Sequence, residues 1–175
     1  MVKRALAAVC ALLCLLALSG CEIQKSLDLP EIKQLKLDMI AAAPSIGSVT
    51  VDYGNDLSPV FTVHGYEISQ EDAQAVVEKA RELFSDENFH DTFFAGLGME
   101  RTKEEVAEAG PPAGPRIKIL MFDSALTGQA FGRLKYSYSS RYFVVENGWE
   151  TDEVDGYATW WGGLVNQDED PLAED

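Results

Sequence analysis

Positive charge is scarce in this chain of 175 residues. Lysine and arginine together number 14, against 29 aspartates and glutamates, and the formal net charge is -15 at pH 7. Proteins bind nucleic acid and anionic lipid head groups largely by neutralising phosphates with lysine and arginine. The charge balance therefore argues against nucleic acid as a partner and against adhesion to an anionic membrane through the protein surface.

Histidine and cysteine, which supply most metal ligands and many nucleophiles, are also few. The chain has two histidines, His64 and His90, far apart in sequence, and three cysteines. It contains neither a His-x-x-x-His nor a Cys-x-x-Cys motif that would hold a metal. It also lacks a Gly-x-Ser-x-Gly elbow, and the segment 128–132 lacks the Gly-Lys-Ser/Thr ending of a phosphate loop. We therefore expect neither a metal nor a cofactor.

The first 21 residues have the composition of an export signal. Lys3 and Arg4 precede an uncharged apolar run from Ala5 to Leu18, and small residues lead from there to Cys21. This order of charged, apolar and small residues is typical of a cleavable signal peptide. The apolar run is shorter than the roughly 20 residues that a helix needs to span a bilayer, so a transmembrane anchor is the weaker alternative.

The segment Leu18-Ser19-Gly20-Cys21 resembles the lipobox of bacterial lipoproteins. In that family the signal is cut just before the cysteine, which then receives a diacylglycerol on its thiol and a fatty acid on its amino group. The resemblance implies that residues 1–20 are removed and that Cys21 is lipidated. An ordinary secretory signal is the alternative. The resemblance implies nothing about the mature domain.

The residue after the cysteine bears on where such a lipoprotein is delivered. In Gram-negative bacteria an aspartate there favours the inner membrane, and this chain has Glu22. The resemblance thus implies the outer membrane, facing the periplasm, if the host is Gram-negative. Two or more acyl chains anchor a protein stably, so the lipid on Cys21 would be the chain's link to the membrane.

Cleavage would leave an acidic chain with Cys21 as its only cysteine. Loss of residues 1–20 removes Cys10 and Cys14, and it also removes Lys3 and Arg4, which takes the formal charge from -15 to -17. No thiol would remain for a disulfide or a metal. The fold must then be held by its core alone.

The remaining length is that of one domain. We expect a lipidated tether over 21–29, a single domain over 30–165 and an acidic, flexible tail over 166–175. No internal repeat is visible, and the aromatic content of the mature chain argues against disorder.

Apolar spacing predicts two main helices. One begins near Pro30 and ends before Pro44, and the other runs from Gln70 to Phe84 with Ser69 as its N-cap. Shorter helical turns are expected over 89–97 and 102–109.

Alternation of apolar and polar residues predicts several strands. These are 49–53 and 60–66 as a hairpin, 116–122 as a central strand covered on both faces, 134–145, and a return strand within 149–154 or 157–161 after the Asn147-Gly148 turn. In the run 134–145 we expect Lys135 on the face opposite Tyr136. The order of elements predicts an α+β fold, an antiparallel sheet with one long and several short helices packed on it.

The aromatic residues suggest a contact surface. Tyr157, Trp160 and Trp161 lie among glycines, and Tyr136 and Tyr138, with Tyr142 beyond them, share one face of a predicted strand. Because successive residues of a strand point to opposite faces, one of the two adjacent tryptophans should be more exposed than the other. Packing in the core is the alternative for all of them.

Three functions are compatible with these features. The first is a lipid-anchored binding or accessory domain of the cell envelope, with an envelope protein or glycan as partner. The second is an envelope hydrolase that uses acids or histidines such as Asp123 or His90; a turn-forming role is the alternative for Asp123. The third is a structural lipoprotein that only tethers envelope components. The sequence favours the first, because the signatures of catalysis are missing.

Overall fold

The computed structural model describes residues 29–54, 57–98, 115–126, 132–147 and 149–165. The cleavage segment and Cys21, nearly all of the tether, the helical turn at 102–109 and the acidic tail lie outside the described residues.

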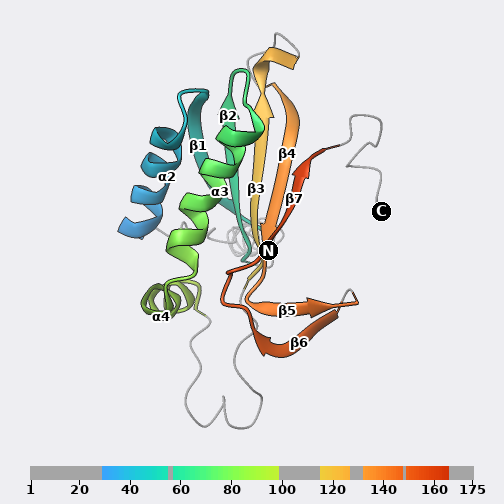
Figure 1. Cartoon of the computed structure of the whole chain (residues 1–175). Coiled ribbons are helices and arrows are strands. Elements are labelled where there is room, and N and C mark those ends of the chain that lie inside the picture. Colours follow the sequence, from blue (N-terminus) through green and yellow to red (C-terminus); the bar gives the residue numbers. More distant parts are fainter. Residues whose placement is uncertain (1–28, 55–56, 99–114, 127–131, 148, 166–175) are drawn as a thin grey trace, which may run out of the picture.

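The chain folds as α+β, which confirms the predicted class (Figure 1). Its helices pack on one face of a five-stranded sheet of order β1-β2-β3-β4-β7, and β5 and β6 form a separate two-stranded sheet. The helices are α2 (Pro30–Ala42), α3 (Gln70–Phe84) and α4 (Glu87–Gly96), and a short 3-10 turn covers Ser124–Leu126. The strands are β1 (Ile46–Tyr53), β2 (Pro59–Gly65), β3 (Ile117–Asp123), β4 (Arg133–Ser140), β5 (Phe143–Glu146), β6 (Trp149–Val154) and β7 (Trp160–Leu164).

The large sheet is antiparallel except at its centre. Strands β1 and β2 form the predicted hairpin, with Val51 opposite Phe61. Strand β3 then runs parallel to β2, with Phe61 opposite Ile119, after a crossover that includes α3 and α4. Parallel neighbours need such a long crossover, whereas antiparallel neighbours can be joined by a tight turn. The carboxyl ends of β2 and β3 therefore lie side by side.

Helix α3 follows its sequence signals closely. The Ser69 side chain accepts a hydrogen bond from the Asp72 N–H, and the Asp72 carboxylate accepts one from the Ser69 N–H. This reciprocal capping box satisfies main-chain donors that the first turn leaves without helical partners. Ile68 and Ala73, on either side of the cap, are both buried, as a hydrophobic staple requires.

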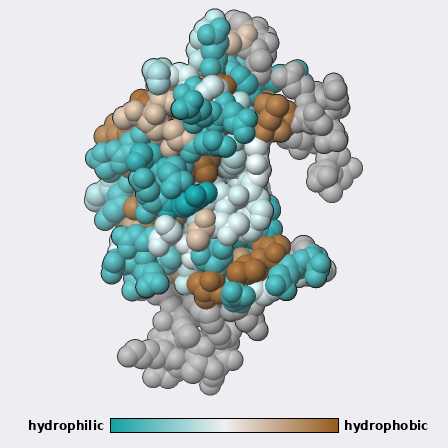
Figure 2. Space-filling view, in the orientation of Figure 1, coloured by the Kyte–Doolittle hydropathy of each residue, from teal (hydrophilic) through white to brown (hydrophobic). Residues whose placement is uncertain are grey.

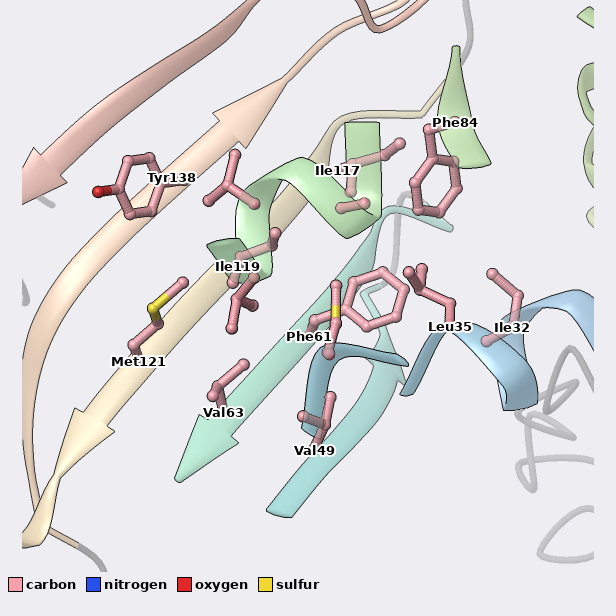
Figure 3. Close-up of a cluster of buried hydrophobic side chains, with 14 of the residues drawn as sticks. Ile32, Leu35, Val49, Phe61, Val63, Phe84, Ile117, Ile119, Met121 and Tyr138 are labelled. Carbon is pink, nitrogen blue, oxygen red and sulfur yellow. The ribbon is translucent and has the colours of Figure 1, made fainter. Parts of the chain in front are cut away.

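The core lies between the helices and one face of the sheet. In Figure 3, Phe61 of β2 lies among side chains from α2 and α3, including Leu35 and Phe84. The Phe84 ring also meets Phe93 and Tyr157 edge-on, with ring centroids 5.2 and 5.9 Å apart. These rings join α3, α4 and the segment before β7 into one apolar cluster.

The other face of the sheet is only half-buried. On β3, Ile117, Ile119 and Met121 are buried, whereas Lys118 and Leu120, which point the opposite way, are partly exposed. The expectation that β3 is covered on both sides is thus corrected, because α2, α3 and α4 all contribute to the same core. This second face is called the open face below.

The hairpin of β5 and β6 carries exposed apolar side chains. Asn147 adopts positive φ, in line with the predicted Asn-Gly hairpin, and the return strand is β6, the first of the two predicted ranges. Strand β7 begins only at Trp160, so it overlaps the second range, 157–161, by two residues. Figure 2 shows a hydrophobic band over the hairpin of β5 and β6, in contrast to the mainly hydrophilic surface over the helices. Val154 and Trp149 are the most exposed large hydrophobic residues there.

Candidate binding hollow at the ends of strands β2 and β3

The carboxylate of Asp123, at the end of β3, joins several parts of the chain. One oxygen accepts hydrogen bonds from the N–H groups of Glu67 and Ala125, at 2.9 and 3.0 Å. The other accepts from the Ile68 N–H at 2.9 Å and from Lys135 Nζ at 2.8 Å. The bond to Ala125 is the turn-forming contact expected for an aspartate in this position. The other bonds fasten the loop between β2 and α3 to the end of β3.

The surroundings of Asp123 favour its charged form. Burial alone would raise the pKa of the carboxyl, but hydrogen bonds from Lys135, Ala125 and Glu67, together with the positive charge of Lys135, outweigh burial and hold the pKa below its ordinary value. Asp123 has no exposed surface. It is an ionised, enclosed group that a substrate on the surface does not touch.

A β-bulge brings Lys135 to this carboxylate. Met121 lies opposite Tyr136 and Phe122 lies opposite Leu134, so Lys135 has no cross-strand partner of its own. The expectation that Lys135 lies on the face opposite Tyr136 is corrected, because the bulge turns its side chain toward Asp123. Its Nζ also donates to the Ile68 carbonyl at 2.7 Å.

A hollow of about 380 Å³ lies beside this junction, where β1 begins and β2 and β3 end, at the top of the sheet in Figure 1. Aromatic rings, hydroxyls and glycine main chain form its walls. Its lining residues are Pro44, Ser45, Gly47, Ser48, His64, Gly65, Tyr66, Phe122 and Ser124. None of them is a lysine, arginine, aspartate or glutamate, so the hollow combines polar and apolar surface without an acidic or basic side chain among these residues.

Two rings form part of its wall. His64 and Phe122 are neighbours across β2 and β3 on the open face, and their rings stack at 5.5 Å between centroids with an interplanar angle of 30°. Tyr66, just beyond the end of β2, is 61% exposed. The hollow therefore presents aromatic surface beside serine hydroxyls.

Gly65 is needed for the close approach of the two segments that border the hollow. The Tyr66 N–H donates to the Ser45 carbonyl at 2.9 Å, and Ser124 Oγ donates to the Gly65 carbonyl at 2.9 Å. A Cβ at position 65 would lie 2.3 Å from the Ser45 oxygen and 2.9 Å from a side-chain carbon of Ile68. Since a main-chain carbonyl cannot move aside easily, only glycine fits this position without a shift of the main chain.

Replacing Gly65 with alanine should lower the free energy of unfolding by about 1–3 kcal/mol, the usual cost of forcing an extra methyl group into a tight contact. The matched control is Gly47→Ala, also in the hollow, where a Cβ would meet its nearest atom, the His64 oxygen, at an ordinary 3.6 Å. Urea unfolding followed by tryptophan fluorescence checks both variants. Equal stability of the two variants would contradict the steric argument.

The second histidine does not join the hollow. His90 on α4 is buried and its Nε2 lies within hydrogen-bonding distance of the Phe84 carbonyl at the end of α3. Since a carbonyl only accepts, the ring nitrogen donates, and His90 caps α3. Its ring packs against Phe94 and Tyr157. His64 and Asp123 lie on neighbouring strands but on opposite faces of the sheet. Among the described residues no group of three histidines, cysteines or acids is placed to hold a metal.

Most of the aromatic residues proposed as a contact surface belong to the core. Tyr136, Tyr138 and Tyr157 are buried, and the Tyr157 hydroxyl donates to the Pro115 carbonyl at 3.0 Å. Burial raises the pKa of Tyr157 and, less strongly, that of Tyr138. Their burial fits the alternative of packing in the core.

The two adjacent tryptophans differ in exposure, as strand geometry predicts. Trp160 packs against the core and its Nε1 donates to the Tyr157 carbonyl at 3.1 Å, whereas Trp161 is among the exposed hydrophobic residues. Of the five proposed contact residues, Trp161 is the one left mainly at the surface.

The comparisons with known proteins give no relative to reason from. No protein-family model matches the chain, and neither the curated proteins nor the solved structures yielded a match. The function must therefore be argued from the residues themselves. Across the described parts of the chain, no helix combines the length and the apolar character needed to cross a membrane.

Sequence reasoning missed the hollow. It considered His64 only as a possible metal ligand and gave no role to Tyr66, Ser48 or Phe122. Each lies at the end or start of a strand, and that position alone carries no functional signal. Only the parallel pairing of β2 with β3 brings His64 next to Phe122 across 57 intervening residues.

Proposed function

We propose that this chain is a bacterial cell-envelope lipoprotein, anchored by lipid on Cys21, whose folded domain acts by binding. The lipobox-like segment Leu18–Cys21 supports the anchor. The hollow at the ends of β2 and β3 supports the binding role, because it combines aromatic rings and hydroxyls in an accessible concave surface. That hollow is the observation on which the proposed activity depends.

A hydrolase finds less support. The acid and the histidine that it would use, Asp123 and His90, are 0% and 6% exposed, and both are engaged in hydrogen bonds within the fold. A general acid or base must come within hydrogen-bonding reach of a reacting group. A purely structural tether would have no use for a hollow of this kind.

The anchor would keep the domain close to the membrane. Residues 21–29 reach at most about 30 Å when fully extended, at roughly 3.3–3.6 Å per residue. A ligand would accordingly lie within the envelope near that surface, either an envelope protein or a glycan. In a Gram-negative host we propose the outer membrane, facing the periplasm, as the location.

The binding role is tested by placing a photo-crosslinking amino acid at Tyr66 of the full chain in living cells. Leu37 on α2 is the control position, since the two side chains are 61% and 59% exposed. We expect a discrete adduct from position 66 and none from position 37, detected as a shift in gel mobility. The same pattern at both positions, or no adduct at either, would contradict binding at the hollow.

A further inference from the structure

Resting on the proposed function, we infer that the hollow binds a neutral sugar ring of an envelope glycan. The inference combines four properties of its lining, namely aromatic surface, free acceptor atoms, absence of charged side chains, and size.

The aromatic surface suits the apolar side of a sugar. A pyranose presents C–H groups on its faces and hydroxyls around its rim, so it packs well on an aromatic ring while its rim stays polar. Tyr66 offers an exposed ring with a polar tip, and His64 and Phe122, whose rings stack on each other, add aromatic surface to the lining. Amphipathic aromatics are common where one side of a ligand is apolar and the other is wet.

The hydroxyls of the hollow suit a ligand that donates hydrogen bonds. Ser45 Oγ donates its hydrogen to Asp72 Oδ2 at 2.9 Å, and Ser124 Oγ donates its hydrogen to the Gly65 carbonyl. A serine oxygen has two acceptor positions besides its one donor. Both oxygens can therefore accept from the rim hydroxyls of a sugar, and the exposed Ser48 hydroxyl can donate or accept.

Charge argues for a neutral ligand. Among the described residues, no lysine or arginine lines the hollow to pair with a phosphate or carboxylate, and no aspartate or glutamate lines it to pair with a cation. The mature chain's formal charge of -17 would also repel anions over a distance. A sugar without acidic substituents needs no charged partner in the lining and is not repelled by the negative charge of the chain.

The size of the hollow suits part of a longer glycan. Small-molecule sites usually measure about 300–1,000 Å³, and this hollow, at about 380 Å³, is near the lower limit. The hollow borders the open face of the sheet, where a glycan chain can extend beyond the hollow. We expect a free oligosaccharide that places one such segment in the hollow to bind weakly.

Titration of the full chain in a mild detergent with the N-acetylglucosamine trimer tests the inference, with glucose 6-phosphate as a charged comparison. We expect saturable binding of the trimer, and affinity about tenfold lower for Tyr66→Ala, the equivalent of one lost aromatic contact. The matched control is Trp149→Ala, since Trp149 is an aromatic residue that is 80% exposed and outside the hollow. It should bind like the natural protein. Unchanged thermal unfolding of both variants shows that the fold is intact.

The outcomes separate this inference from the proposed function. No binding of the trimer, binding that survives Tyr66→Ala, or tighter binding of glucose 6-phosphate would each overturn the sugar as ligand. A crosslinked adduct specific to position 66 would in that case still support binding at the hollow. If the trimer does not bind and no adduct specific to position 66 forms, the proposed function is contradicted as well.

Discussion

Replacing Asp123 with alanine should lower the free energy of unfolding by about 3–5 kcal/mol, the usual result of leaving one partner of a buried ion pair alone. The carboxylate is fully buried and bonds three main-chain N–H groups as well as Lys135 Nζ. Alanine would remove the acceptor of all three N–H groups, of which the Ile68 N–H is buried, and would leave Lys135 Nζ with the Ile68 carbonyl alone among the described residues. Urea unfolding of the full chain in a mild detergent, followed by tryptophan fluorescence, measures the loss.

The control is an ion pair of the same length on the surface. Lys79 Nζ lies 2.8 Å from Glu82, as Lys135 Nζ lies 2.8 Å from Asp123, but the side chains of the first pair are 38% and 56% exposed, against 21% and 0% in the second. Exposed pairs contribute little to stability, so Glu82→Ala should leave the unfolding midpoint nearly unchanged. A similar loss in both variants would show that burial of Asp123 does not have the effect argued here.

Asp123→Asn provides a milder change if the alanine variant does not fold. Asparagine keeps the volume of the side chain and one acceptor oxygen, but its amide nitrogen cannot accept from the N–H groups now bound to the second oxygen. We expect a loss of stability smaller than that of Asp123→Ala. Stability equal to that of the natural protein would contradict the role assigned to the charged carboxylate.

Because of the same carboxylate, the free energy of unfolding should depend on pH in the acid range. Its pKa in the folded chain is held below the ordinary value, which is about 3.9 in an unfolded chain. A carboxyl of lowered pKa stabilises the fold fully above the unfolded pKa and loses that contribution as pH falls through the folded value. The difference in stability between the natural protein and Asp123→Asn should therefore be constant near neutrality and narrow only below about pH 4.

Local signals explain which elements were predictable. Helix α3 was predicted with its bounds, because the capping residue Ser69 and the apolar spacing that ends at Phe84 are written within one segment. The hairpin of β1 and β2 and the turn at Asn147 were predictable for the same reason. In each case the residues that determine the structure are close in sequence.

Contacts between distant segments explain what was missed. The bulge that directs Lys135 to Asp123, and the loop at Ile68 that the carboxylate holds, depend on segments 12 and 55 residues away. The apolar periodicity of a segment does not reveal contacts at such separations in sequence. The hollow lies beside the same junction, so Asp123, which the sequence offered as a possible catalytic acid, supports the candidate site without lining it.

The burial of the tyrosines shows a second limit. Tyr136 and Tyr138 alternate on a strand in the way that either a core face or a contact face would. Which face the helices cover is decided by the parallel crossover from β2 through α3 and α4 to β3. Alternation indicates that a strand has two unlike faces, but it does not indicate which of them is open.

Replacing Cys21 with serine should abolish lipid attachment. Serine has no thiol to receive a diacylglycerol. The natural chain should incorporate an alkyne-tagged fatty acid and enter the detergent-rich phase on Triton X-114 separation. The Cys21→Ser chain should lose the label entirely and shift toward the aqueous phase wherever its signal is removed.

Cys14→Ser is the matched control, because Cys14 lies in the same N-terminal stretch but is not preceded by the lipobox-like residues. It should keep both the label and the partition of the natural chain. Each buried methylene contributes about 0.8 kcal/mol, so several acyl chains bind far more tightly than one. Residues 21–175, with a formal charge of -17, gain no attraction to anionic lipid in their place. Labelling that persists in Cys21→Ser, or that disappears in Cys14→Ser, would therefore contradict the anchor at Cys21.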